Sequence, residues 1–108
     1  MAFDKKAVQL YPSAATDTVI YTCPVSTQTD VISIFIANQS SIADTFTINH
    51  VIGGGASTTA SVLYPSISIP GNDTFLITTP IFMVATDVLR VTSVNGTCSF
   101  NIEITEKT

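Results

Sequence analysis

The alternation of apolar and polar residues predicts short β-strands along most of the chain. Asp30–Asn38 (DVISIFIAN) is the clearest case, because its apolar side chains recur with the period of two that a strand requires. The run is short and rich in β-branched residues, which favours a strand over a buried helix. The residues that we expect to face the core are Ile32, Ile34 and Ile36.

The second face of this central strand is also mostly apolar. It carries Val31, Phe35 and Ala37 together with Ser33. A strand with two apolar faces is usually covered on both sides. We therefore expect a loop or another subunit to cover the second face.

Asp44–Ile52 alternates as cleanly as the central strand. Phe46 and Ile48 would face inward, and His50 follows them in phase at the strand end. Because strands that follow one another usually pair, we expect this strand to form a hairpin with Asp30–Asn38.

The C-terminal part predicts a second hairpin. Asp87–Val94 would place Leu89 and Val91 inward and Val88 outward. Asn95-Gly96 follows at once, and this pair is typical of a two-residue type I′ hairpin turn. The inward residues of the returning strand, 97–106, would be Cys98, Phe100, Ile102 and Ile104.

The whole chain, residues 1–108, is predicted to be one all-β domain. We expect about eight to ten short strands in a single antiparallel β-sandwich of jelly-roll or Ig-like type, because turn signals recur about every ten residues. Residues 1–6 are polar and are expected to form a flexible arm that orders on contact. The other predicted strands are Ala7–Tyr11, Thr18–Cys23, Ala60–Tyr64 and Thr74–Thr78, with a short edge-like piece between Pro65 and Pro70, a short apolar segment at Ile81–Val84 and a mobile loop at Gly53–Thr59.

Charge and hydropathy exclude several partners. The net charge is −4, and four scattered cations cannot build the basic face that nucleic-acid binding needs. No apolar run approaches the length of a membrane helix, and the first residues lack the apolar region of a signal peptide. Charged residues make up only 11 % of the chain, and a surface with so little charge favours association with copies or partners.

Few residues could carry chemistry, so we expect no enzymatic activity, no cofactor and no metal site. His50 is the only histidine, and the nearest acids in sequence that could assist it as a general base are Asp44 and the distant Asp73 and Asp87, so we expect it to be a partly buried packing residue. Cys23 and Cys98 are expected to be free buried thiols; one disulfide is the alternative, and this spacing fits no zinc pattern. The aspartates that we expect to cap turns through backbone amides are Asp17, Asp30, Asp44, Asp73 and Asp87.

Four segments resemble small virion proteins and fibre-associated domains of bacteriophages. They are VIYTCP (Val19–Pro24), DVISIFIANQS (Asp30–Ser40), ISIPGNDTF (Ile67–Phe75) and ATDVLRVTS (Ala85–Ser93). The resemblance spans about three quarters of the chain, and it consists of turn and core signatures. Cys23 stands where the family usually has an apolar residue such as Val, which agrees with a buried thiol.

The resemblance implies a β-sandwich that decorates or joins parts of a phage particle after assembly in the host cytoplasm. A capsid decoration (cement) protein, clustered as a trimer and bound to copies of itself and to major capsid proteins, is the first expectation. A small tail, collar, baseplate or fibre-associated component is the alternative. A carbohydrate-binding adsorption module is a further one, although the chain has no Trp and only Tyr11, Tyr21 and Tyr64 as tyrosines. The residues that we expect at the interface are Met1, Ala2, Phe3, Asp4, Lys5, Lys6, Phe35 and Val88.

Overall fold

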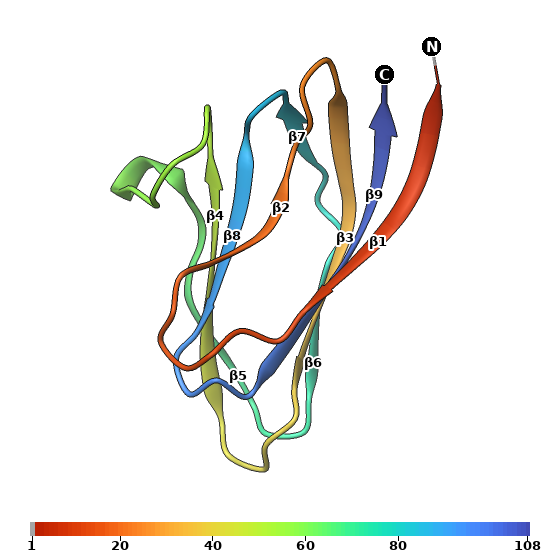
Figure 1. Ribbon diagram of the computed structural model, residues 1–108. Helices are drawn as coiled ribbons and strands as arrows, with labels where there is room; N and C mark the ends of the chain where they lie inside the picture. The colour runs from red at the N-terminus through yellow and green to blue at the C-terminus, as the bar shows by residue number, and fades with distance from the viewer. Residues whose placement is uncertain (1) are drawn as a thin grey trace.

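The computed structural model describes residues 2–108 and is a β-sandwich, as predicted. Two antiparallel sheets pack face to face and form the two layers visible in Figure 1. The elements are β1 (Phe3–Leu10), β2 (Thr18–Thr22), β3 (Gln28–Asn38), β4 (Asp44–Val51), the 3-10 helix η1 (Thr59–Ser61), β5 (Val62–Ile69), β6 (Thr74–Ile77), β7 (Ile81–Val84), β8 (Val88–Ser93) and β9 (Cys98–Lys107).

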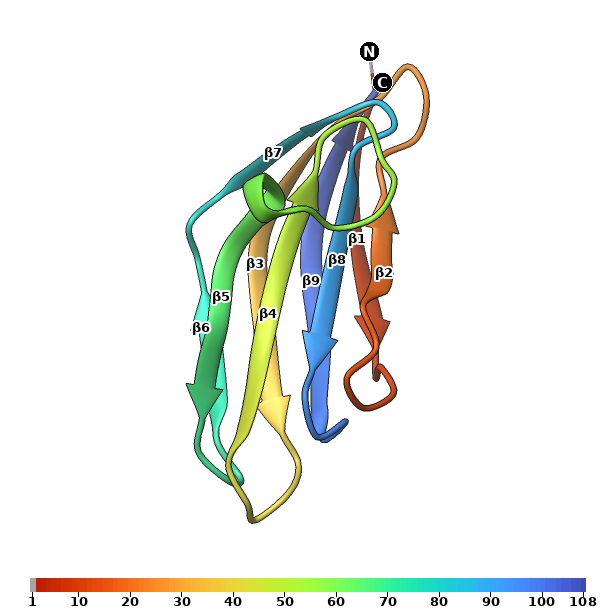
Figure 2. The same cartoon turned by 90° about the vertical axis from the view of Figure 1, so that its left-hand side faces the viewer.

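The larger sheet has the order β1-β9-β3-β6, and β7 also pairs with β3. The smaller sheet has the order β2-β8-β4-β5 and lies in front of the larger one in Figure 2. Both chain ends belong to the larger sheet and lie side by side, where the Thr108 amide donates to the Ala2 carbonyl at 3.0 Å. The ends of the chain therefore mark one end of the sandwich.

The core contains the inward residues of both sheets. Phe46 of β4 packs edge-to-face against Phe100 of β9 and Phe75 of β6, so it joins the two sheets. The alternation predicted for the last strand is confirmed, and its inward residues are almost fully buried. The predicted inward positions of β4 and β8 are confirmed in the same way; they are Phe46, Ile48, Leu89 and Val91.

The phase predicted for the central strand is correct in only one half. Ile34 and Ile36 are buried, but Ile32 is 46 % exposed and Val31 is buried in its place. The pairing of β3 with β9 shifts register between Val31 and Ser33, where β3 has one extra residue. Such a bulge exchanges the faces on either side of it.

Neither predicted hairpin exists, because both connections cross between the sheets. β3 lies in the larger sheet and β4 in the smaller one; β8 and β9 are likewise divided. Among the described strands, β4 and β5 are the only consecutive pair that hydrogen-bond to each other. The sheets therefore form mainly from strands that are distant in sequence.

The Asn95-Gly96 turn, which crosses between the sheets, is bound to the side chain of Asp44. The Asn95 amide donates to Asp44 Oδ1 at 2.8 Å, and the Thr97 hydroxyl donates to Asp44 Oδ2 at 2.9 Å. Gly96 has a positive φ of 70°, whereas Asn95 does not have the positive φ that a type I′ turn needs. This turn is therefore not the type I′ hairpin turn that the sequence predicted.

Two predicted boundaries also change. Residues 3–6 were predicted to be a flexible arm, but they continue β1, which pairs with β9 from Phe3 opposite Lys107 to Leu10 opposite Phe100. The segments predicted around Pro65 merge into one strand, β5, in which Ser66 adopts a positive φ of 44°. β5 is an edge strand, as that proline indicated.

Candidate functional site

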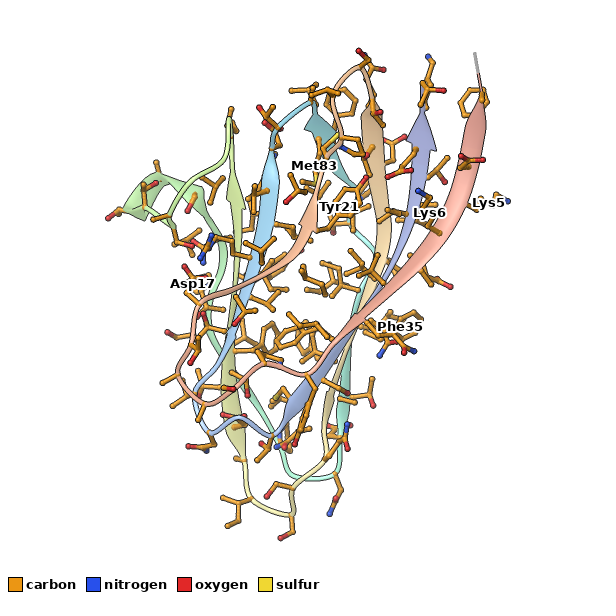
Figure 3. All side chains as sticks on the ribbon, in the orientation of Figure 1. Lys5, Lys6, Asp17, Tyr21, Phe35 and Met83 are labelled. Atoms are coloured by element: carbon orange, nitrogen blue, oxygen red, sulfur yellow. The ribbon has the colours of Figure 1, made fainter. Side chains whose placement is uncertain are left out.

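The surface best suited to a partner is an apolar strip on the outer face of the larger sheet. Its members are Ile32, Phe35, Leu76, Phe82 and Val84, which we call the apolar strip. Phe35 of β3 stands directly opposite Leu76 of β6, and Figure 3 shows Phe35 pointing away from the space between the sheets. These two side chains are 37 % and 51 % exposed.

The strip exists because β6 and β7 pair in turn with the same side of β3. β6 pairs with residues 34–37 of β3, and β7 pairs with residues 28–31. Phe82 of β7, which is 56 % exposed, stands opposite Asp30, and Val84 stands opposite Gln28. The bulge in β3 adds Ile32 to the same face between these two pairs. Apolar side chains from three strands therefore meet on one face.

The rest of this outer face is mostly polar, apart from the exposed ring of Phe3 at its β1 edge, and it is electrically balanced. β9 and β1 contribute Glu103, Lys107 and Lys5, and β3 contributes Asp30. Glu103 accepts a hydrogen bond from the Ser33 hydroxyl at 2.7 Å, and the Lys107 ammonium lies 5.9 Å from the centre of the Phe3 ring. Two cations and two anions cancel, so the net charge of −4 is carried by residues elsewhere on the chain.

The sheet edges, by contrast, are poorly suited to pairing with another strand. β1 has Lys5 and Lys6 in its middle, β2 is bulged between Val19 and Tyr21, and β5 contains Pro65. On the remaining edge, β6 and β7 have only four residues each. Lysines, bulges, prolines and short strands are the features by which edges avoid pairing with other chains. A partner is therefore better placed on the face than on an edge.

A polar cluster around the buried carboxylate of Glu106 connects β1 and β2 to β9 near the chain ends. The carboxylate of Glu106 accepts from the Lys6 ammonium at 2.7 Å and from the Tyr21 hydroxyl, which also lies 2.8 Å from the Thr29 hydroxyl. The bonds from Lys6 and Tyr21 lower the pKa of Glu106. Burial and the bond to Glu106 raise the pKa of Tyr21. Because every group is satisfied within the cluster, it serves to hold β1 in place.

His50 and Asp87 are distant in sequence but lie together. His50 Nε2 is 3.0 Å from Asp87 Oδ2, and the Asp87 carboxylate also accepts from the amides of Gly53 and Val84. Although burial opposes the ionised form, these bonds lower the pKa of Asp87. The predicted packing role of His50 agrees with its mostly buried ring, and the pair ties the glycine loop to the sandwich.

The cysteines are buried thiols, as expected. Cys23 Sγ lies 3.3 Å from the carbonyl of Thr27, and Cys98 Sγ lies 3.5 Å from Asp44 Oδ2. They lie near opposite ends of β3, about 30 Å apart at 3.3 Å per residue. Burial raises the pKa of Cys98 to about 11.

Three of the five predicted turn aspartates bind backbone amides, namely Asp44, Asp73 and Asp87. Asp17 instead accepts from the Arg90 guanidinium at 3.0 Å, and Asp30 lies exposed on the outer face. Within residues 2–108, no three His, Cys, Asp or Glu side chains gather as a metal would require. Over the same residues, no helix has the length and hydropathy needed to cross a membrane.

The residues predicted at the interface differ in how exposed the structure leaves them. Phe35 is exposed as expected, but Val88 is only 7 % exposed and does not form part of an open surface. It lies beneath the glycine loop, where a Cβ on Gly54 would be 3.7 Å from Val88 Cγ2. Phe3, Asp4, Lys5 and Lys6 belong to an edge strand, Ala2 precedes it, and Met1 lies outside the described residues.

Sequence reasoning missed four members of the apolar strip. Leu76, Phe82 and Val84 lie in short strands whose pairing partner was not predicted, and Ile32 was assigned to the core. All four residues of IFMV are apolar, so the sequence could not tell that Ile81 and Met83 face the core while Phe82 and Val84 face outward. Comparison with protein-family models, with curated proteins and with solved structures found no match for this chain.

Proposed function

We propose that the protein is a structural component of a bacteriophage particle, most specifically a capsid decoration protein. The observation that carries this proposal is the apolar strip on a mostly polar and electrically balanced face. Exposed apolar side chains gathered on one face are typical of a protein that works against another protein surface. The bacteriophage assignment itself rests on the sequence resemblance described above.

The proposed mechanism is adhesion by repeated weak contacts. A small rigid sandwich presents one face, and each copy gains modest free energy from burying apolar side chains. When many copies occupy a regular particle, several such contacts act together, and their combined strength far exceeds that of one contact. No catalytic step is needed, and the buried His50–Asp87 pair serves the fold.

The test is binding to empty capsids, followed by cosedimentation and by counting the copies bound per particle. Saturable binding at many copies per particle supports decoration. A protein that binds purified tails or baseplates and ignores capsids would move the proposal to the alternative position. Binding to none of these particles would overturn it.

A second candidate is a carbohydrate-binding adsorption module, favoured by one exposed aromatic residue. Tyr11 is 57 % exposed beside a hollow that Gln9, Gln39 and Asn101 help to line. Tyr21 is buried and Tyr64 packs against the core, so neither offers a free ring. Glycan-array binding that is lost in Tyr11→Ala and kept in Tyr64→Phe would support this function over the first.

A further inference from the structure

We infer that the apolar strip is the contact between two copies of this chain, related by a two-fold axis. This inference deepens the proposed function by naming one partner of the same face, a second copy. The argument rests on the size of the strip, on the charge of its surroundings and on the symmetry that a single patch permits.

The size fits one ordinary interface. The five side chains of the strip are roughly half exposed, so they present about 500 Å² if each has about 200 Å² of surface. A standard interface buries about 800 Å² on each partner, and about 57 % of that area is apolar. The strip can therefore supply the whole apolar part of one such interface, with the neighbouring polar residues as its rim.

The charges fit a second copy. Two molecules with a net charge of −4 repel each other over most of their surfaces. The outer face of the larger sheet avoids this repulsion, because Lys5 and Lys107 balance Asp30 and Glu103. A face that carries both signs can meet an identical face and pair opposite charges.

The symmetry follows from there being one patch. In a two-fold dimer the same surface patch is used by both subunits, whereas a ring of three needs two different complementary patches. The other exposed apolar residues within 2–108 are dispersed: Val25, Ile42 and Ile52 lie on loop tips, Val19 and Leu63 on opposite edge strands of the smaller sheet, and Phe3 at the β1 edge of the larger one. The strip therefore favours a dimer over the trimer that the sequence resemblance implies.

The experiment is the mass of the purified native chain in solution over a range of concentrations, by sedimentation equilibrium. The expected mass is twice the 11.4 kDa of one chain. Leu76→Glu and Phe82→Glu each place a charge within the contact, toward its opposite ends, and should raise the dissociation constant about 30-fold or more. Ile52→Glu is the matched control, because it adds the same charge at a loop tip that is 79 % exposed, and it should dimerise like the native chain.

A second measurement needs no variant. Hydroxyl-radical footprinting of the native chain at low and high concentration should show Leu76 and Phe82 becoming protected as the dimer forms, with Ile52 unchanged. A monomer at every concentration, a trimer, or a dimer that both face variants leave intact would overturn the inference. Dimerisation without capsid binding would instead leave this inference standing and count against the proposed function.

Discussion

At the scale of single residues, Asp44 connects segments that are far apart in sequence. It is buried at the start of β4, and its carboxylate accepts from the Ser93 hydroxyl at 2.6 Å and from the amides of Thr45 and Asn95. Burial opposes ionisation, but these bonds outweigh it and lower the pKa of Asp44. One carboxylate thus fixes the end of β8 and the turn that leads to β9.

We expect Asp44→Asn to destabilise the protein by about 3 kcal/mol, because hydrogen bonds to a charged group are worth about 1.5 to 3 kcal/mol each. The amide would also place N–H groups opposite other donors. The measurement is urea unfolding at pH 7. Asp73→Asn is the control, because Asp73 is exposed and its carboxylate accepts only from the amide of its neighbour Thr74, so the change should alter stability by less than about 0.5 kcal/mol.

The same carboxylates make the fold sensitive to acid. The pKa values of Asp44, Asp87 and Glu106 are lower in the folded state than their ordinary values of 3.8, 3.8 and 4.5. Between its folded and ordinary pKa, each group binds more protons in the unfolded chain, so the free energy of unfolding should fall as the pH drops below about 4.5. Unfolding curves at pH 7, 5, 4 and 3 would measure this, and Asp44→Asn should show a shallower decline. A stability that is unchanged down to pH 3 would contradict the assignment.

The alternation of single residues was predictable where the ladder is regular. On β9 the period of two correctly identified the buried positions, because the strand keeps its phase over the core. On β4 it did so for Phe46 and Ile48 but failed at Asn49, which is out of phase with them and yet only 4 % exposed. On β3 the same reasoning failed at Ile32, where one extra residue at the bulge moves this side chain outward. A bulge is set by the pairing partner, so the sequence of β3 alone could not reveal it.

At the scale of elements, the strands were predictable and their partners were not. Turn signals marked most strand ends. Asn95-Gly96, however, was predicted to form a hairpin within one sheet, whereas it connects the two sheets. The local pattern of a turn says that the chain reverses; it does not say which sheet receives the next strand. Here the turn donates hydrogen bonds to the carboxylate of Asp44, which lies some fifty residues away in sequence. The apolar strip was missed for the same reason, because it depends on β6 and β7 sharing one side of β3.

Among the four glycines with a positive φ, Gly96 should be the least replaceable. It has a positive φ, and a Cβ at this position would lie 2.8 Å from the backbone nitrogen of Ala14. We expect Gly96→Ala to cost about 3 kcal/mol, from the left-handed backbone and from the contact. Gly55→Ala is the control, because Gly55 also has a positive φ but open space around it, and it should cost about 1 to 2 kcal/mol. If Gly96→Ala and Gly55→Ala lower the free energy of unfolding in urea by the same amount, the contact with Ala14 contributes nothing.

At the scale of the whole molecule, the lysines, bulge, proline and short strands at the sheet edges should confine association to one face. β1 is the longest fully exposed edge of the larger sheet, and it would extend the sheet of another copy if nothing prevented it. Lys5 lies in the middle of this edge, and Figure 3 shows its side chain pointing away from the sandwich. A charged side chain there must lose its hydration when a strand is added, so the open edge stays unpaired.

We therefore expect Lys5→Val to associate beyond the dimer by adding strands at β1. The substitution also makes the net charge more negative, so general repulsion between copies should increase, and any growth of aggregates would be due to the edge. Light scattering over time and thioflavin binding are the measurements, with growth at least about tenfold faster than in the native chain. Lys107→Val is the matched control: it removes the same charge, but Lys107 lies on β9, which is flanked by Phe3 of β1 and Gln28 of β3 and so offers no open edge, and this variant should show no growth of aggregates. If both variants aggregate alike, loss of a surface charge is the cause; if neither does, the edge is blocked by something other than Lys5, and Lys6 is the next residue to replace.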